Sequence, residues 1–257
     1  MDIHLRNKVA VITGGTAGIG LATAELFARE GARIAFCSRS PANVAGALDY
    51  LKVRGLSAYG EAVDVSDRAG LFSFADRVEG KFGGIDVWVS NAGIYPAKKV
   101  IDTSEDLWRT VMDVNLKSVY YGGIICADKL RKRGGGVLIN AASFASIMPS
   151  VGSGAYAATK AAIVSMTKSL AAELAPFNIR VVGFIPGVIE TPMTESWIRN
   201  KGKILASQCV LQRIGRAEEV ANALLFMASD KASYITGTCM EITGGKFCVQ
   251  NPQDAWA

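Results

Sequence analysis

The stretch "VITGGTAGIG", residues 11–20, limits the possible folds more than any other part of the sequence. An apolar strand pattern leads into it from residue 8, and a helical pattern begins at residue 18. Glycines at 14, 18 and 20 allow a tight turn and let a ligand approach the backbone closely. The N–H groups and dipole of the following helix then attract an anion such as a pyrophosphate. This strand–turn–helix context predicts a dinucleotide site rather than a plain tight turn.

Strand and helix patterns alternate along the rest of the chain. Strands are predicted at 8–13, 33–37, 57–63, 86–90, 136–141, 180–185 and 239–243, and helices at 18–30, 41–53, 67–82, 104–130, 154–175 and 217–229. Several strands are apolar almost throughout, as expected when helices cover both faces of a parallel sheet. We therefore expect an α/β fold: a Rossmann-type, doubly wound parallel sheet of about seven strands with helices on both faces.

No linker, repeat or low-complexity segment divides the 257 residues. The sequence predicts one dinucleotide-binding and catalytic domain over 1–257. One long stretch, 187–216, contains Pro192 and Gly202 and is predicted to form a short helix within a loop. Long excursions of this kind often cover binding sites, so we expect this segment to be a substrate lid.

Composition and charge exclude several classes of protein. Half the residues are hydrophobic and a fifth are charged, as in ordinary globular proteins. No apolar run reaches the ~18 residues that span a bilayer, and the start of the chain resembles no signal peptide, so we expect a cytoplasmic protein without a membrane partner. The basic run "KLRKR" at 129–133 meets three glycines, which favours cations at a helix C-terminus over a nucleic-acid patch.

The cysteine and histidine content argues against metal and hydrolase sites. The five cysteines are scattered without a C-x-x-C pair and are predicted to be small core residues in a reducing compartment. His4 is the only histidine. We therefore expect no metal, and Ser-His-Asp hydrolysis would require His4 to reach a site.

The end of the second strand predicts which dinucleotide is bound. An acidic side chain there would accept a hydrogen bond from a ribose 2′-OH, but the strand ends "AFCSRS", with Ser38 and Arg39 at this point. An arginine offers a 2′-phosphate a charge-assisted fork, so NADP(H) is expected to be preferred over NAD(H); a solvated arginine is the alternative. Asp64, which ends the third strand, could accept from the adenine amino group or cap the next helix.

A Tyr-x-x-x-Lys spacing occurs twice, as Tyr156…Lys160 and Tyr95…Lys99. The first lies in an Ala- and Leu-rich helical pattern, where positions i and i+4 share a face. A nearby ammonium lowers the pKa of a phenol, which suits Tyr156 to proton transfer near neutral pH. Tyr95 is followed by Pro96 in a loop pattern, so it is predicted to be a pocket wall.

Several strings then occur in one family's order: "TGGTAGIG" at 13–20, "SNAG" at 90–93, Asn115 in "MDVNLKS", Ser143, Tyr156 with Lys160, and "PGVIET" at 186–191. The chain resembles the short-chain dehydrogenase/reductase family, in its single-domain branch of about 250 residues. This resemblance implies that Tyr156 donates or accepts the proton and that Lys160 also holds the nicotinamide ribose. It implies that Ser143 orients the substrate carbonyl and that Asn115 supports a water chain, although a satisfied buried amide is an alternative for Asn115.

The resemblance also implies a cofactor site and a homotetramer. The cofactor residues would be Gly14, Thr16, Gly18, Ile19, Gly20, Ser38, Arg39, Asp64, Val65, Asn91, Ala92, Gly93, Tyr156, Lys160, Pro186, Gly187, Ile189 and Thr191. In the tetramer, helices 104–130 and 154–175 would pack between subunits, and Ala157, Ala161, Ala171 and Ala172 would allow close approach. The family's second NADP signal, a basic residue before Gly18, is missing because Ala17 stands there.

The predicted substrate pocket is apolar. Its residues are Tyr95, Phe144, Met148, Val151, Met193 and Trp197, which suggest a neutral, partly apolar ketone or alcohol. The predicted function is hydride transfer between NADP(H) and a carbonyl or secondary alcohol. An alternative is a 3-oxoacyl-thioester (acyl-carrier-protein) reductase, with Lys98, Lys99 or Arg131–Arg133 facing an acidic carrier. A cofactor-sensing regulator without catalysis is more distant, and enoyl reduction is disfavoured because related enoyl reductases space the tyrosine and lysine more widely.

Overall fold

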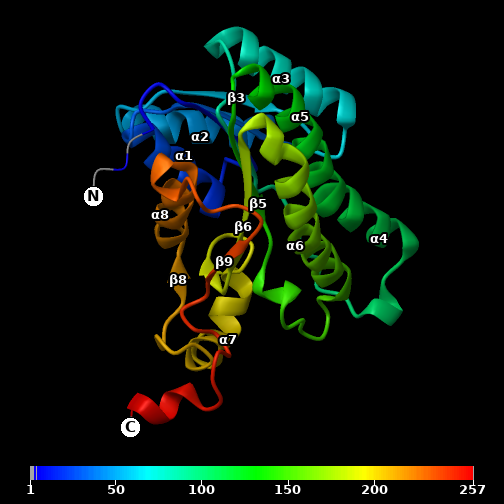
Figure 1. The fold of residues 1–257 in the computed structure, drawn as a ribbon. Coiled ribbons are helices and arrows are strands. Elements are labelled where there is room, and N and C mark those ends of the chain that lie inside the picture. The colour runs from blue at the N-terminus through cyan, green and yellow to red at the C-terminus, as the bar shows by residue number, and fades with distance from the viewer. Residues whose placement is uncertain (1–2, 4, 257) are drawn as a thin grey trace.

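A seven-stranded parallel sheet forms the centre of the computed structural model, which describes residues 3 and 5–256 (Figure 1). The strand order is β3-β2-β1-β4-β5-β6-β9. The strands are β1 (Val9–Thr13), β2 (Arg33–Ser38), β3 (Ala58–Ala62), β4 (Val87–Ser90), β5 (Gly136–Ala141), β6 (Ile179–Pro186) and β9 (Cys239–Ile242). The doubly wound parallel sheet predicted from the alternating pattern is confirmed.

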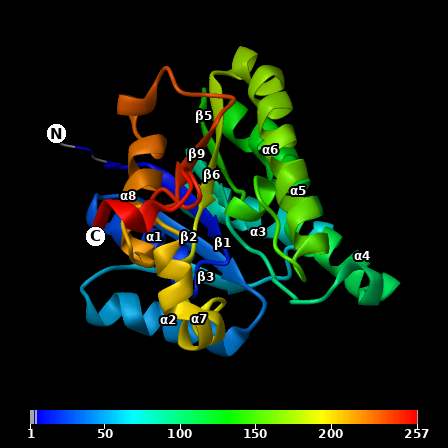
Figure 2. The same ribbon diagram turned by 90° about the horizontal axis from the view of Figure 1, so that it is seen from below.

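Helices cover both faces of this sheet (Figures 1 and 2). One layer contains α1 (Gly18–Arg29), α2 (Pro41–Val53) and α8 (Ala217–Ala228). The other contains α3 (Arg68–Phe82), α4 (Glu105–Met112), α5 (Ser118–Lys132) and α6 (Gly154–Leu174). Short 3-10 turns lie at Val100–Asp102, Phe144–Ser146, Ala175–Phe177, Asp230–Ala232 and Pro252–Trp256.

Strand β1 shows why the strand patterns are apolar throughout. Ala10 and Ile12 belong to the core under α1 and α8, whereas Val9 and Val11 belong to the core under α3 and α5. All four side chains are fully buried. Because neither face of the strand meets water, the alternation of polar and apolar residues seen in one-sided sheets is absent.

The order of the strands places a binding site between β1 and β4. The chain moves outward from β1 to β2 and β3, then returns to β4 on the other side of β1. Loops that leave the carboxyl ends of the strands separate at such a reversal and leave a crevice, which is where open α/β sheets bind ligands. The loops after β1, β4, β5 and β6 all leave the sheet at this edge.

Two predicted segments differ in detail from the structure. The predicted helix 104–130 is interrupted: α4 ends at Met112, a π-helical turn spans Asp113–Lys117, and α5 continues to Lys132. The predicted excursion 187–216 contains α7 (Glu195–Ser207) and the paired strands β7 (Ile189–Glu190) and β8 (Gly215–Arg216). Its helix is kinked at Lys201, where φ is −135° and ψ is 16°.

The basic run ends α5, as predicted, and most of its cations are paired with carboxylates. Lys129 Nζ lies 2.5 Å from Asp76 and 2.6 Å from Glu79, and Lys132 lies 2.8 Å from Asp128. No helix in the described part of the chain is long and apolar enough to cross a membrane. Within those same residues no cluster of three or more His, Cys, Asp or Glu side chains could hold a metal ion, and the cysteines are free thiols. His4 lies outside the described residues.

Candidate active site

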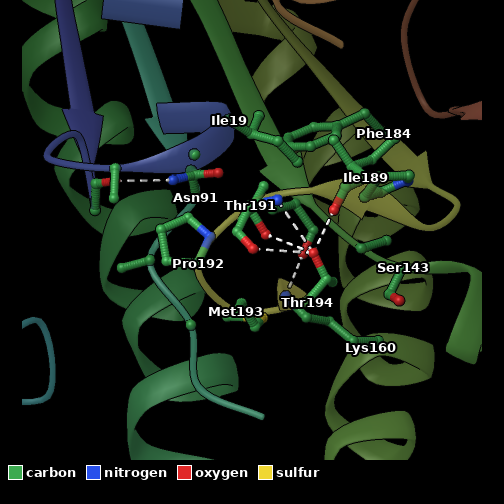
Figure 3. Close-up of a pocket in the computed structure, with 18 of the residues that line it drawn as sticks. Ile19, Asn91, Ser143, Lys160, Phe184, Ile189, Thr191, Pro192, Met193 and Thr194 are labelled. Carbon is green, nitrogen blue, oxygen red and sulfur yellow. Dashed lines mark hydrogen bonds between the residues drawn. The ribbon is translucent and has the colours of Figure 1, made fainter. Parts of the chain in front are cut away.

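The loop between β1 and α1 forms a cradle that only glycine can build. Gly14 and Gly18 have φ of +67° and +51°. A Cβ on Gly14 would lie 2.9 Å from Ala92 Cα, and one on Gly18 would lie 2.9 Å from Thr191 Cγ2. Asn91 Nδ2 donates to the Thr13 carbonyl at 3.1 Å and to the Gly14 carbonyl at 3.3 Å (the latter bond is drawn in Figure 3), which fixes the loop from the side of β4. The backbone N–H groups at the start of α1 are thereby left to face an anionic ligand.

A cavity of about 260 Å³ opens beside this cradle. It joins the glycine loop, the loop after β4, the end of β5, the start of α6 and the segment after β6. The residues predicted for the cofactor that line it are Gly14, Gly18, Ile19, Asn91, Ala92, Gly93, Tyr156, Lys160, Pro186, Gly187, Ile189 and Thr191. Ser143 also lines it.

Other residues predicted for the cofactor lie outside the lining of this cavity: Thr16, Gly20, Ser38, Arg39, Asp64 and Val65. Gly20 supports the loop from behind, since a Cβ there would collide with the Gly14 carbonyl oxygen. Arg39 is exposed directly after β2. Asp64 Oδ1 accepts from the backbone and hydroxyl of Ser66 at 2.9 and 2.7 Å, and Asp67 rather than Asp64 caps α3. Capping by Asp64, one alternative from the sequence, is therefore wrong.

Tyr156 and Lys160 lie on one face of α6, next to β5. Lys160 Nζ donates to the Ala141 carbonyl at 2.6 Å and lies 5.5 Å from the centroid of the Tyr156 ring. Burial without a carboxylate partner lowers the pKa of Lys160 to about 8. Burial raises the pKa of Tyr156, and a side-chain hydrogen bond with Ser143 opposes that rise. The ammonium stands near the phenol but makes no direct hydrogen bond with it in the described structure.

Two further predicted residues hold this part of the site together. Ser143 follows β5, where its hydroxyl accepts from the Ala145 N–H at 3.2 Å and begins the turn Phe144–Ser146. Asn115 is fully buried in the π-helical turn. Its Oδ1 accepts from Ile94 N–H at 2.8 Å, and its Nδ2 donates to the Ile94 carbonyl at 2.9 Å and to Thr159 Oγ1 at 3.4 Å. The side chain is thus a satisfied buried amide that ties the loop after β4 to α6.

A second cavity, of about 720 Å³, adjoins the first; the residues that line both are Ser143, Tyr156, Gly187, Met193 and Thr194. All six predicted substrate residues line it: Tyr95, Phe144, Met148, Val151, Met193 and Trp197. The Tyr95 ring lies edge-on to the Tyr156 ring, with centroids 4.9 Å apart, and to the Trp197 ring, at 4.8 Å. Tyr95 therefore forms a wall of this cavity, and its loop position keeps it apart from a helical lysine partner.

Sequence reasoning missed several residues around these cavities. The Thr194 hydroxyl stabilises the turn after β6: it donates to the Ile189 carbonyl and accepts from Thr191 N–H at 3.1 Å (Figure 3). Lys246 and Gln208 line the second cavity and are hydrogen-bonded to each other at 2.5 Å. The one available signal was a basic residue directly after Gly244 and Gly245, where the last strand ends near the predicted crevice.

Comparisons with known proteins agree with this geometry. Residues 14–246 match the model of a family described as enoyl-(acyl carrier protein) reductase. Over 247 residues the chain is 38% identical to "Dehydrogenase/reductase SDR family member 4" of Oryctolagus cuniculus, covering 94% of each protein. It is 39% identical to the 3-oxoacyl-(acyl-carrier-protein) reductase FabG of Thermotoga maritima, covering 95% of this chain and 99% of that one.

Solved structures are similar over almost the whole chain. A short-chain type dehydrogenase/reductase from Mycobacterium marinum superposes with a TM-score of 0.92 at 31% identity, covering 96% of this chain and 98% of that one. A 7α-hydroxysteroid dehydrogenase complexed with NADH and 7-oxo glycochenodeoxycholic acid gives a TM-score of 0.90 at 30% identity, covering 95% and 96%.

Proposed function

The chain belongs to the short-chain dehydrogenase/reductase family, and we propose that it transfers a hydride between NADP(H) and the carbonyl or secondary alcohol of a small molecule, with Tyr156 as general acid and base. Members of this family are oxidoreductases that use a nicotinamide cofactor and act on alcohol and carbonyl groups. The residue roles, the choice of NADP(H) and the substrate are the proposal.

One observation carries this proposal: the two cavities meet at Ser143 and Tyr156. The cavity beside the glycine loop suits a dinucleotide, because the cradle is anion-binding and no Cβ could occupy Gly14, Gly18 or Gly20 without a close contact. The larger, mostly apolar cavity suits the organic substrate. The Ser143 hydroxyl and the Tyr156 phenol at this junction could both donate hydrogen bonds to the carbonyl oxygen of a substrate.

The residues at the junction supply the proton chemistry. When bound, the cofactor supplies or accepts the hydride at the carbonyl carbon. During reduction, Ser143 Oγ donates a hydrogen bond to the carbonyl oxygen, and the Tyr156 hydroxyl gives its proton to that oxygen as negative charge develops on it. Lys160, with a pKa of about 8, is mostly protonated at neutral pH, and its Nζ, 5.5 Å from the centroid of the Tyr156 ring, stabilises the resulting phenolate. Oxidation of an alcohol reverses these steps.

The expected preference for NADP(H) rests on the end of β2. Ser38 and Arg39 stand where an acidic residue would repel a 2′-phosphate, and Arg39 is exposed and makes no ion pair among the described residues. A guanidinium of this kind can form two charge-assisted hydrogen bonds with a phosphate.

A 3-oxoacyl-thioester reductase is the second candidate, favoured by the 39% identity to the Thermotoga maritima enzyme. Lys98 and Lys99 are exposed beside Ala97, which lines the substrate cavity, so they could meet an acidic carrier. Arg131–Arg133 are exposed farther from the cavity, because α5 runs antiparallel to the strands and ends just before β5 begins, at the opposite edge of the sheet.

We also propose a homotetramer in the cytoplasm. The free and largely buried thiols of Cys37, Cys126 and Cys209 support a reducing compartment.

The test of the function is a turnover screen. The purified protein is assayed with ketones, secondary alcohols and a 3-oxoacyl thioester, each with NADP(H) and NAD(H). We expect ketone reduction with NADPH. A protein that turns over none of these compounds with either cofactor would contradict the proposal, and turnover of the thioester alone would favour the second candidate.

A further inference from the structure

Lys246 is a buried cation in the wall of an otherwise mostly apolar substrate cavity. It follows the last strand, and only 9% of the residue is exposed. Its Nζ donates to Gln208 Oε1 at 2.5 Å and lies 4.5 Å from the centroid of the Phe247 ring and 5.7 Å from that of Phe144. These contacts shield the ammonium from water and leave donors available, since –NH₃⁺ has three N–H groups.

No carboxylate in the described structure balances this charge. The salt bridges formed by lysines involve Lys117, Lys129 and Lys132, and none involves Lys246. No Asp or Glu is among the 23 residues that line the cavity, whereas a second cation, Lys201, lines it from the exposed side of α7. Burial lowers the pKa of Lys246, as expected for an ammonium without a counter-ion.

An unpaired buried charge is unfavourable, and that cost is relieved when an anion arrives. A carboxylate placed at Lys246 would gain a charge-assisted hydrogen bond in a region of low dielectric, without competing acidic groups. A neutral substrate would have to leave the ammonium desolvated. The cavity thereby discriminates by charge as well as by apolar shape.

We propose that Lys246 is a specificity residue that selects an apolar oxo acid, or the corresponding hydroxy acid, by binding its carboxylate while Ser143 and Tyr156 hold its carbonyl or hydroxyl group. This proposal rests on the proposed function and narrows it, because the sequence alone suggested a neutral substrate. A single buried ammonium matches the single negative charge of a carboxylate better than it matches a phosphate dianion.

Binding of an unreactive probe tests the charge selection without turnover. Decanoate and 1-decanol are titrated by calorimetry into wild type, Lys246→Met and Lys246→Arg. We expect Lys246→Met to weaken decanoate binding by about tenfold or more, Lys246→Arg to retain most of it, and 1-decanol to distinguish the variants by no more than about threefold. Lys203→Met on α7 is the matched control, since Lys203 is exposed and does not line the cavity.

Steady-state kinetics then tests whether a carboxylate on the substrate increases kcat/KM through Lys246. A series of (ω−1)-keto carboxylates, which carry a methyl ketone at the end opposite the carboxylate, is compared at increasing chain length with the corresponding methyl esters. We expect one range of lengths in which the acid exceeds its ester in kcat/KM by about tenfold or more, mainly through KM, and a ratio near one for Lys246→Met. Equal use of acids and esters by wild type would overturn the proposal while leaving ketone reduction intact.

The two arms separate the possible failures. If decanoate binds wild type and Lys246→Met equally, Lys246 does not select a carboxylate, whatever the turnover results. If decanoate binding depends on Lys246 but no ketone is reduced, the charge selection stands and the proposed function fails. Inorganic phosphate that displaces decanoate at micromolar concentration would overturn the choice of a carboxylate as the bound group.

Discussion

Two tyrosines in edge-to-face contact lie at the junction of the cavities, and we expect only one of them, Tyr156, to transfer a proton. Tyr156 shares its helix face with Lys160 and lines both cavities together with Ser143, whereas Tyr95 lies between Tyr156 and Trp197. We expect Tyr156→Phe to lower kcat by ~10²-fold or more, because only the proton-transfer group is removed. Tyr95→Phe, the same chemical change in the wall, should alter KM at most. Steady-state kinetics of both variants tests these expectations. A near-normal kcat for Tyr156→Phe would show that another group donates the proton.

The buried ammonium of Lys160 makes stability depend on pH. Its pKa in the folded protein is about 8, below the ordinary value of 10.5, so below pH 8 the folded state bears the full cost of a desolvated charge. Between pH 8 and 10.5 the unfolded chain holds a proton that the folded chain has released, and stability from this group rises with pH. Lys160→Met lacks the group. We expect the free energy of unfolding of wild type, relative to this variant, to rise by about 3 kcal/mol across that window in urea titrations. A constant difference would show that Lys160 is not desolvated.

The proposed preference for NADP(H) rests on Arg39. We expect wild type to favour NADP(H) in kcat/KM, and Arg39→Ala to lower the ratio of NADP(H) to NAD(H) by about tenfold or more, because a charge-assisted contact with the 2′-phosphate is lost. Arg109→Ala is the control, since Arg109 is exposed on α4 and bound to Glu105 at 2.7 Å. If wild type has an equal or higher kcat/KM with NAD(H) than with NADP(H), the alternative, that Arg39 is a solvated loop residue, is correct.

At the scale of elements, we expect replacement of glycine by alanine to have opposite effects in the glycine loop and in α2. Gly18→Ala forces a side chain onto a residue with φ of +51°, 2.9 Å from Thr191 Cγ2. We expect it to weaken cofactor binding by roughly tenfold or more, from backbone strain of ~1–2 kcal/mol and loss of close approach. Gly46 lies in the exposed interior of α2 with nothing within 4 Å of a Cβ. Gly46→Ala should instead stabilise the fold by ~0.5–1 kcal/mol and leave cofactor binding unchanged. Fluorescence titration with NADPH and urea unfolding measure the two effects.

The elements that could be predicted from the sequence are those whose local pattern and tertiary environment agree. Strand 136–141 was predicted to the residue, because an apolar run buried on both faces has little choice of structure. The break between α4 and α5 was missed because the apolar pattern continues through it. The π-helical turn there contains Asn115, whose hydrogen bonds with Ile94 are tertiary contacts. Local periodicity does not encode such contacts.

At the scale of the whole molecule, site residues could be predicted where a sequence motif indicates its own structural context. They could not be predicted where the site depends on contacts between segments far apart in the sequence. Tyr156, Lys160 and Ser143 could be brought together because the ends of parallel strands share one edge of the sheet. Lys246 could not, because its burial depends on Gln208 at the end of α7 and on Phe144 after β5. Ala157 and Ala171 were predicted to face another subunit, but they face the core of their own, since they share the inward side of α6 with Lys160 and Ile163. Ala161 and Ala172 are exposed.

The outward side of α5 and α6 therefore remains the surface on which a tetramer would be built. It exposes Ala161 and Ala172 together with Tyr120, an aromatic side chain that is 52% exposed in the single chain. We expect sedimentation velocity at micromolar concentration to give a species of four times the 27.2 kDa chain. Ala161→Arg should shift it towards smaller species, because four guanidinium groups would be brought into close-packed interfaces. Ala42→Arg, a change at another exposed alanine, on α2 at the opposite face of the sheet, should leave the tetramer intact. A wild type that sediments as a monomer would contradict the tetramer, and an unchanged Ala161→Arg would place the interface on another surface.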